Sequence, residues 1–129
     1  MLTADRWLYA TLKNDTTLAA VIGARIYADI APEGSIYPLA ILSQVISLPV
    51  SNWSADKVMN DEVWRIRLTT DKADYGAIET AAERIQTLLH KQTGTGVIGC
   101  TAEGITRFSE IESGQVYKHL VLEFRIYTQ

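Results

Sequence analysis

The residue types best suited to covalent chemistry in this sequence are one cysteine, Cys100, and two histidines, His90 and His119. A nucleophilic thiol needs a base within hydrogen-bond reach, and distance along the chain does not exclude a pair of Cys100 and His119. Cys100 lies in the apolar segment 97–102, however, where a cysteine usually packs as a small hydrophobic side chain. His90 falls in the last turn of a predicted helix, where a partly charged imidazole complements the helix dipole. We therefore interpret Cys100 and His90 as structural residues.

His119 lies on the non-core face of the predicted last strand, where it is either exposed to solvent or at an interface. It keeps one alternative function open: a small α+β enzyme or ligand-binding domain that uses Cys100 and His119 in a pocket beneath a long loop. This alternative requires a reactive thiol, because the thiolate and not the thiol is the nucleophile.

No pattern typical of a metal, phosphate or acid–base site is present in the sequence. No two Cys, His, Asp or Glu residues show a metal-ligand spacing that a second pair repeats. Glu79 and Glu83 are one helical turn apart, but with Arg84 beside them they are typical of a solvated helix face. The glycine-rich segment 93–99 follows a helix instead of opening one, so it lacks the helix N-terminus that binds phosphate. The sequence therefore predicts no catalytic, cofactor-binding or metal-binding residues.

The N-terminal part of the chain is predicted to be helical before it turns into a sheet. The leucine spacing favours a first helix over Thr3–Lys13. Asp15 or Thr16 can cap a second short helix, and Gly23 ends it because glycine tolerates the left-handed conformation. The residues at 25–27 are then predicted to be extended.

The middle of the chain is predicted to contain a strand followed by a loop. Leu39–Ser47 follows a proline and is rich in branched apolar residues, which favours a strand. Both of its faces are apolar, which indicates a strand covered on both sides. The next segment, Leu48–Asn60, is mostly polar and is predicted to be a long loop with Trp53 near its middle. Loops of this length tend to be functional or mobile.

The rest of the chain is predicted to form strands around one helix. Glu62–Thr69 alternates apolar and polar residues, which is typical of a strand with one core face. A long helix is predicted from a cap at Asp71–Asp74 to about Lys91, because apolar residues recur at helical spacing. The further strands are predicted at 97–102 and 105–111, as two strands or one strand broken near Gly104, and at 117–127 after a turn at Ser113-Gly114.

These elements predict an α+β fold in a single domain over residues 1–129. We expect a mainly antiparallel sheet of four to five strands, with one long helix and the short N-terminal helices packed on one face. The length of 129 residues is that of one ordinary domain.

Two sets of residues are candidates for a subunit or tube interface. The first set is charged and is predicted on the outward faces of two strands: Arg65, Arg67, Glu123 and Arg125. These side chains form either solvated charge pairs, each contributing about 0.2–1 kcal/mol, or an inter-subunit surface, where arginine is favoured. The second candidate is Trp53, which either folds back onto the core or anchors a neighbouring subunit as tryptophan hot spots do.

Composition narrows the class of protein. Hydrophobic residues make up 47% of the chain and charged residues 21%, as in ordinary globular proteins. A net charge of −3 without a Lys/Arg run argues against a grip on nucleic-acid phosphates, although DNA can pass such a surface without specific binding. We find no signal peptide and no apolar run of about 20 residues, so we expect no membrane contact and a cytoplasmic origin.

A distinctive series of short elements runs through the first third of the chain. It comprises Leu8, Leu12 and Leu18, then Ile22–Tyr27 (IGARIY), Ala31-Pro32, Gly34 and Tyr37-Pro38. This leucine-spaced helical start, G-x-R-I-Y element, A-P-x-G turn and proline before a strand resembles one known family. These are the small tail-completion proteins of long-tailed bacteriophages and prophages, also called tail terminator or tail-to-head joining proteins. The total length and the later order of strand, helix and closing strands are similar to that family as well.

The resemblance implies a structural protein of the virion tail that is assembled in the host cytoplasm. Members of the family form a ring, usually of six subunits, that caps the tail tube, stops its growth and presents a surface to the head connector. The implied partners are further copies of the chain, the tail tube protein and the head–tail connector protein, and DNA passes through the centre of the ring. The family brings no catalytic residues and no cofactor to this sequence. An oligomeric adaptor of another kind would share the ring prediction.

Overall fold

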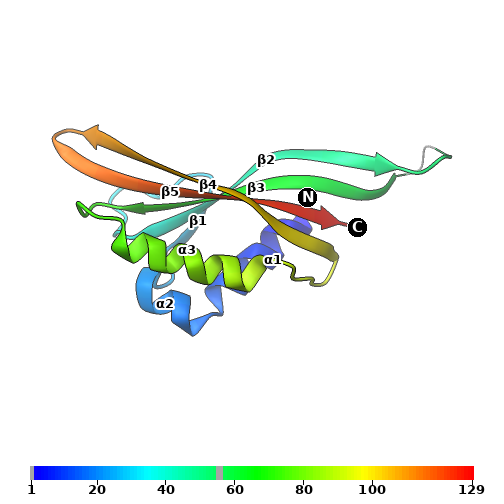
Figure 1. The fold of residues 1–129 in the computed structure, drawn as a ribbon, viewed down its shortest axis with the longest axis horizontal. Coiled ribbons are helices and arrows are strands. Elements are labelled where there is room, and N and C mark those ends of the chain that lie inside the picture. Colours follow the sequence, from blue (N-terminus) through cyan, green and yellow to red (C-terminus); the bar gives the residue numbers. More distant parts are fainter. Residues whose placement is uncertain (1, 55–56) are drawn as a thin grey trace.

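The computed structural model describes residues 2–54 and 57–129, and its elements form two layers (Figure 1). Within these residues the order is α1 (Leu2–Lys13), α2 (Thr16–Ile22), β1 (Ile26–Ala28), β2 (Leu39–Ser51), β3 (Lys57–Thr70), α3 (Gly76–Leu89), β4 (Val97–Glu112) and β5 (Gln115–Thr128). The strands form one sheet in the order β1-β2-β3-β5-β4. All three helices lie on the same side of this sheet, which leaves its other face open. The predicted α+β class and one-sided helical layer are therefore confirmed.

The sheet is mixed, which corrects the prediction of a mainly antiparallel one. β1 runs parallel to β2, with Ile26 opposite Ala40, whereas the other three strand pairs are antiparallel. The connection at 29–38 carries the chain back far enough to enter β2 in the same direction as β1. A strand of three residues leaves almost no periodic pattern in the sequence, so the parallel pair could not be read from it.

The prediction of one long helix is also wrong. α3 has 14 residues against 12 in α1, and it begins at Gly76 instead of within Asp71–Asp74. Asp74 accepts a hydrogen bond from the backbone N–H of Gly76 at 2.9 Å, so it holds the turn before the helix. His90 already has an extended backbone, which ends the helix at Leu89. The predicted helix was too long because the polar residues at both ends belong to turns.

The segment Leu48–Asn60 is a β-hairpin and not the predicted long loop. β2 continues to Ser51 and β3 starts at Lys57, and the two strands pair through a bulge at Val45. Part of the predicted loop, residues 55–56, lies outside the described residues. Both faces of this hairpin are solvated at its end, so its strands carry polar residues that resemble those of a loop.

Two hairpins project past the helices in opposite directions, as Figure 1 shows. We call residues 43–54 with 57–65 the β2–β3 arm, and residues 104–123 the β4–β5 arm; the base of each arm still belongs to the central sheet and its core. The β4–β5 arm confirms the predicted turn at Ser113-Gly114, where both residues have positive φ. β4 is one strand with a bulge between Ala102 and Gly104, which is one of the two predicted arrangements.

The hydrophobic core lies between the helices and one face of β3 and β5. Alternate residues of these strands point to the helices, as the alternation in β3 predicted: Trp64, Ile66, Leu68, Leu120, Leu122, Phe124 and Ile126. The predicted seam of α3 packs against them through Ile78, Ala82, Ile85 and Leu89. β2 is covered on both faces only over 39–42, because Val45 and Ile46 are exposed. Burial of this apolar face supplies most of the driving force for folding.

Asp15 connects the second helix to the third. Its carboxylate accepts the backbone N–H of Leu18 at 2.8 Å, which confirms it as the cap of α2. The Arg84 guanidinium of α3 donates to the same carboxylate from two nitrogens, at 2.9 and 2.7 Å. Hydrogen bonds from Arg84, followed by the one from Leu18, hold the pKa of Asp15 below its usual value against the opposing effect of burial.

We expect Asp15→Asn to lower the free energy of unfolding at neutral pH by an amount that vanishes in acid. The pKa of Asp15 is lower in the folded than in the unfolded protein, so its charge stabilises the fold above the unfolded pKa. That contribution is lost as the pH falls through the folded pKa, below about 4. Asp15→Ala also removes the cap and should cost about 1 kcal/mol more than Asp15→Asn. Urea unfolding at neutral and acid pH measures both differences, and a gap between wild type and Asp15→Asn that does not change with pH would contradict this account.

Candidate assembly surface

The four charged candidates share the open face of the sheet. Arg65 and Arg67 lie on β3, and Glu123 and Arg125 lie on β5, between residues that point to the helices. The strand register puts Arg65 directly opposite Glu123, and their charged groups are 3.5 Å apart. The prediction that these residues share one outward face is thus confirmed. Their role in an interface stays a prediction.

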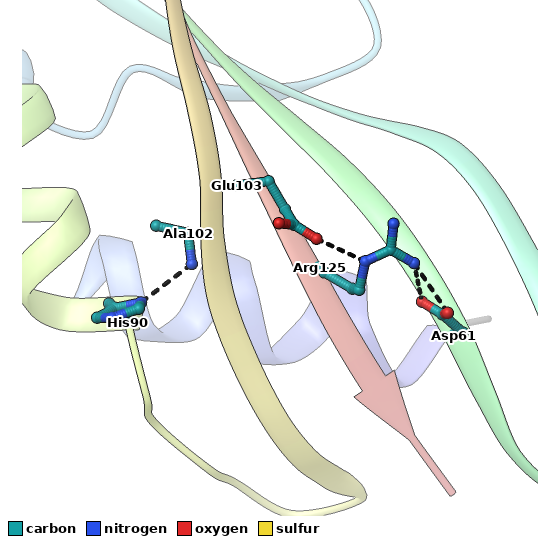
Figure 2. A network of polar contacts seen from close by, with 5 residues as sticks. All are labelled: Asp61, His90, Ala102, Glu103 and Arg125. Atoms are coloured by element: carbon teal, nitrogen blue, oxygen red, sulfur yellow. Dashed lines mark hydrogen bonds and ion pairs between the residues drawn. The ribbon is translucent and has the colours of Figure 1, made fainter.

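Arg125 is bound on both sides by carboxylates from neighbouring strands (Figure 2). Its Nε donates to Glu103 of β4 at 2.6 Å, and its Nη1 donates to both oxygens of Asp61 of β3 at 2.7 and 2.8 Å. These two carboxylates raise the pKa of Arg125 above its usual value. Arg125 therefore holds three strands in register at this point, in addition to any contact with a partner.

Arg67 is less well satisfied than Arg125. Its Nε is buried and makes no hydrogen bond within the described residues. The side chain lines an open depression of about 350 Å³, together with Arg65, Ser43, Phe108 and others. An incoming carboxylate is the group that suits two arginines in such a place, because guanidinium and carboxylate geometries match.

His119 lies on the open face, as predicted, but it is buried and not solvent-exposed. Its Nδ1 is 2.9 Å from the hydroxyl of Thr69, and its Nε2 is 2.5 Å from the carboxylate of Glu110. The ring of Phe108 stacks on it with a centroid distance of 4.6 Å. Burial lowers the pKa of His119, and Arg67 lowers it further, against the opposing effect of Glu110. His119 thus ties β3, β5 and β4 together within one subunit.

The structure does not bring Cys100 and His119 together. Cys100 is buried in the core beneath the helices, whereas His119 lies on the opposite face of the sheet. Burial raises the pKa of the Cys100 thiol to about 12. His90 does not serve it as a base either, because its Nδ1 accepts the backbone N–H of Ala102 at 3.0 Å (Figure 2). The enzyme alternative based on these residues therefore finds no support in the geometry, and Cys100 acts as the small core residue predicted.

We expect Cys100 to resist thiol reagents in the folded protein between pH 7 and 9, because the thiolate is the reactive form. Reaction with a chromogenic disulfide should become fast once urea unfolds the chain and restores the thiol pKa to about 8.5. The unfolded protein serves as the control for reagent access. Rapid labelling of the native protein, rising with pH near neutrality, would contradict burial and revive the enzyme alternative.

Both arms carry large apolar side chains that are exposed to solvent in the isolated subunit. The exposed large apolar residues of the arms are Val45, Ile46, Leu48, Trp53, Val58, Ile105, Phe108 and Ile111. Trp53 lies in the hairpin turn and is fully exposed, so it does not fold back onto the core. Apolar groups gathered on projecting elements are typical of surfaces that bind other proteins. The sequence predicts the turn and the strands of the β4–β5 arm but not its exposed apolar residues, although Ile105, Phe108 and Ile111 break the alternation expected of a half-buried strand.

The described residues offer no group of three or more His, Cys, Asp or Glu that could hold a metal ion. Among them, no helix has the length and apolar character needed to cross a bilayer. Several charged groups of the open face form cross-strand pairs within the subunit, as Arg65 does with Glu123 and Arg125 with Asp61. Charges on the sheet and exposed apolar residues on the arms are features typical of surfaces that bind other proteins.

Comparisons with known proteins agree with this picture. A chain in the solved structure titled "Virion of native gene transfer agent (GTA) particle" is 22% identical to this chain, with a TM-score of 0.68. The similarity covers 94% of this chain and 90% of that one, so the two share a fold. No curated protein sequence matches the chain. The family described as "Tail completion protein gp17" matches residues 6–129, nearly the whole sequence. The chain therefore belongs to this family of phage tail completion proteins, as its first third suggested.

Proposed function

We propose that this protein forms a ring of six subunits that caps the tail tube and joins it to the head connector. The observation that carries the proposal is membership of the tail completion family over residues 6–129. The likeness to a chain of a virion particle is consistent with a place in an assembled tail. In this proposal the protein is made in the host cytoplasm, becomes part of the tail and lets DNA pass through the ring without specific binding.

The shape of the subunit suits a ring. A ring needs a heterologous interface, in which two different patches of the same subunit fit each other and the rotation closes. The two arms are such a pair of different patches, and they project in opposite directions (Figure 1). A net charge of −3 is compatible with a lumen through which DNA passes without specific binding.

The partners follow from the same proposal. Each subunit contacts further copies of itself in the ring, the tail tube protein on one side and the connector protein on the other. We assign Arg65, Arg67, Glu123 and Arg125 to a surface that meets a subunit or the tube. We assign Trp53 the role of an anchor in a partner's pocket, because a fully exposed tryptophan buries a large area when it docks.

We expect the purified protein to form closed rings in a concentration-dependent way. Light scattering after size exclusion gives the mass of the particle, and negative-stain images give its shape and symmetry. Addition to isolated tails that lack an end ring should place a ring at one end of the tube and block further addition of tube subunits. A strict monomer at high concentration, together with bare tube ends, would contradict the proposed function. Rings that form but do not bind to isolated tails would indicate an oligomeric adaptor of another kind.

We expect Trp53→Ala to weaken binding without unfolding the subunit. The side chain contacts no core residue, so the free energy of unfolding should change by less than about 0.5 kcal/mol. Loss of an interface anchor should raise the dissociation constant of the ring or of the ring–tube contact by a factor of about 30 or more. Ile36→Ala is the matched control, because Ile36 is exposed but lies outside both arms. A fall in thermal stability, or unchanged binding in both assays, would reject the anchor role.

A further inference from the structure

The outer edge of β2 is unpaired over most of its length. β1 pairs with β2 only at Ala40–Leu42, and no other described segment pairs with this edge over Ser43–Ser51. A free edge of this length presents backbone N–H and C=O groups that another strand can use. Pro49 within it is typical of an edge strand, since proline has no backbone N–H to donate to a neighbouring strand.

The outer edge of β4 is covered in its first half and free in its second. The backbone N–H of Ala102 donates to His90 (Figure 2), and the carbonyl of Cys100 accepts the N–H of Lys91 at 2.7 Å. From Ile105 to Glu112, no described strand lies on this side of β4. The fold therefore blocks one half of the edge with its own residues and leaves open the half that belongs to the β4–β5 arm.

We propose that the free edge of β4, Ile105–Glu112, pairs with the free edge of β2, Ser43–Ser51, in the next copy of the chain. This inference rests on the proposed ring and specifies how its subunits join. β2 and β5 run one way along the sheet, and β3 and β4 run the other way. When subunits repeat in the same orientation, β4 of one copy therefore meets β2 of the next antiparallel. The sheet then continues across the boundary with its helices on the same side.

The faces of the two strands fix the register. On β4, Phe108 lies opposite His119 and so points to the open face. On β2, Leu48 lies opposite Asp61 and points to the open face as well. Pairing Phe108 with Leu48 matches the faces and puts Ile105 beside Ser51 and Glu112 beside Ser43. The two free stretches then coincide in length, because the extra residue at the Val45 bulge has no partner.

The side chains that meet in this register are complementary. Phe108 and Leu48 are both exposed apolar residues in the free subunit, and they become a cross-strand pair. Glu112 arrives next to Ser43, whose other neighbour across the sheet is Arg65. The side chain of Arg65 is 51% exposed and is 3.5 Å from Glu123, so it has room for a second carboxylate. An acidic arm end thus meets the arginines of the open face.

The pairing also fixes how steeply the strands run in the ring. Within one subunit Gly104 shares a row with Ser43, whereas in the proposed contact Glu112 does, an offset of eight residues. This is about 26 Å along the strands for a sheet about 19 Å wide. The strands would therefore tilt by roughly 54° from the ring axis, which is steeper than the 35–45° typical of closed β-barrels.

An engineered disulfide tests the register directly. Thr106→Cys and Val50→Cys lie opposite each other in the proposed pair and on the same face, with the short Cα spacing that a disulfide needs. Mild oxidation of the double variant should give a ladder of cross-linked subunits on a non-reducing gel, ending at the number of subunits in the ring. The native Cys100 is buried and stays out of the reaction. Ile105→Cys with Val50→Cys is the matched control, because these residues are close but on opposite faces of the sheet.

Each outcome decides one point. A ladder in the first variant and none in the control supports the edge pairing. Rings without a ladder, or equal ladders in both variants, reject the pairing but leave the proposed function standing. A ladder that runs on into open chains without a final closed species supports the pairing and rejects the ring. No rings and no ladder reject both.

A second pair of variants tests the contact without cysteines. Leu48→Gln lies on the proposed edge, whereas Val58→Gln lies on the same arm with similar exposure but on β3. Leu48→Gln should raise the ring dissociation constant at least tenfold and leave the thermal midpoint of the monomer unchanged, and Val58→Gln should change the ring little. Equal effects of the two substitutions would overturn the assignment of β2 as the contact strand.

Discussion

The burial of one face of β3 and β5 under three helices is the contact on which the rest of the structure depends. Both strands are central in the sheet, and each belongs to one of the two hairpins. Their buried residues Ile66, Leu68, Leu122 and Phe124 form the middle of the core. The helices are shorter than the strands, so they cover only the middle of the sheet (Figure 1). The arms project because nothing covers their ends.

The one-sided core also explains the character of the open face. Because no second apolar layer covers this face, its polar groups must form hydrogen bonds with side chains on neighbouring strands or with solvent. Arg125 is held by Asp61 and Glu103, and His119 by Thr69 and Glu110. These pairs stabilise the register of β3, β5 and β4, and they keep a charged surface fixed in place. A surface with charges of both signs in fixed positions can discriminate between partners by charge complementarity, and it remains hydrated in the free subunit.

Local patterns predicted local structure well. The Asp15 cap, the end of α2 at Gly23 and the core face of β3 could be predicted because each depends on a few neighbouring residues. The β2–β3 arm could not, because a hairpin solvated on both sides has the composition of a loop. The partners of Arg125 and His119 come from distant strands, so they depend on a register that no single-sequence pattern contains. The family resemblance named the type of assembly but none of the contacts that would build it.

Assembly would give the ends of the two arms the neighbouring strands that they lack in the isolated subunit. Beyond Asn60 on one arm and Lys118 on the other, the sheet narrows to two strands. A two-stranded hairpin is only marginally stable in water, since each strand satisfies its backbone on one side and packs against no core. Pairing between arms of neighbouring subunits would widen the sheet at both places at once. The arms would then be most firmly ordered in the ring. On this view the exposed apolar residues of the arms are the part of the fold that becomes covered when a second copy pairs with them.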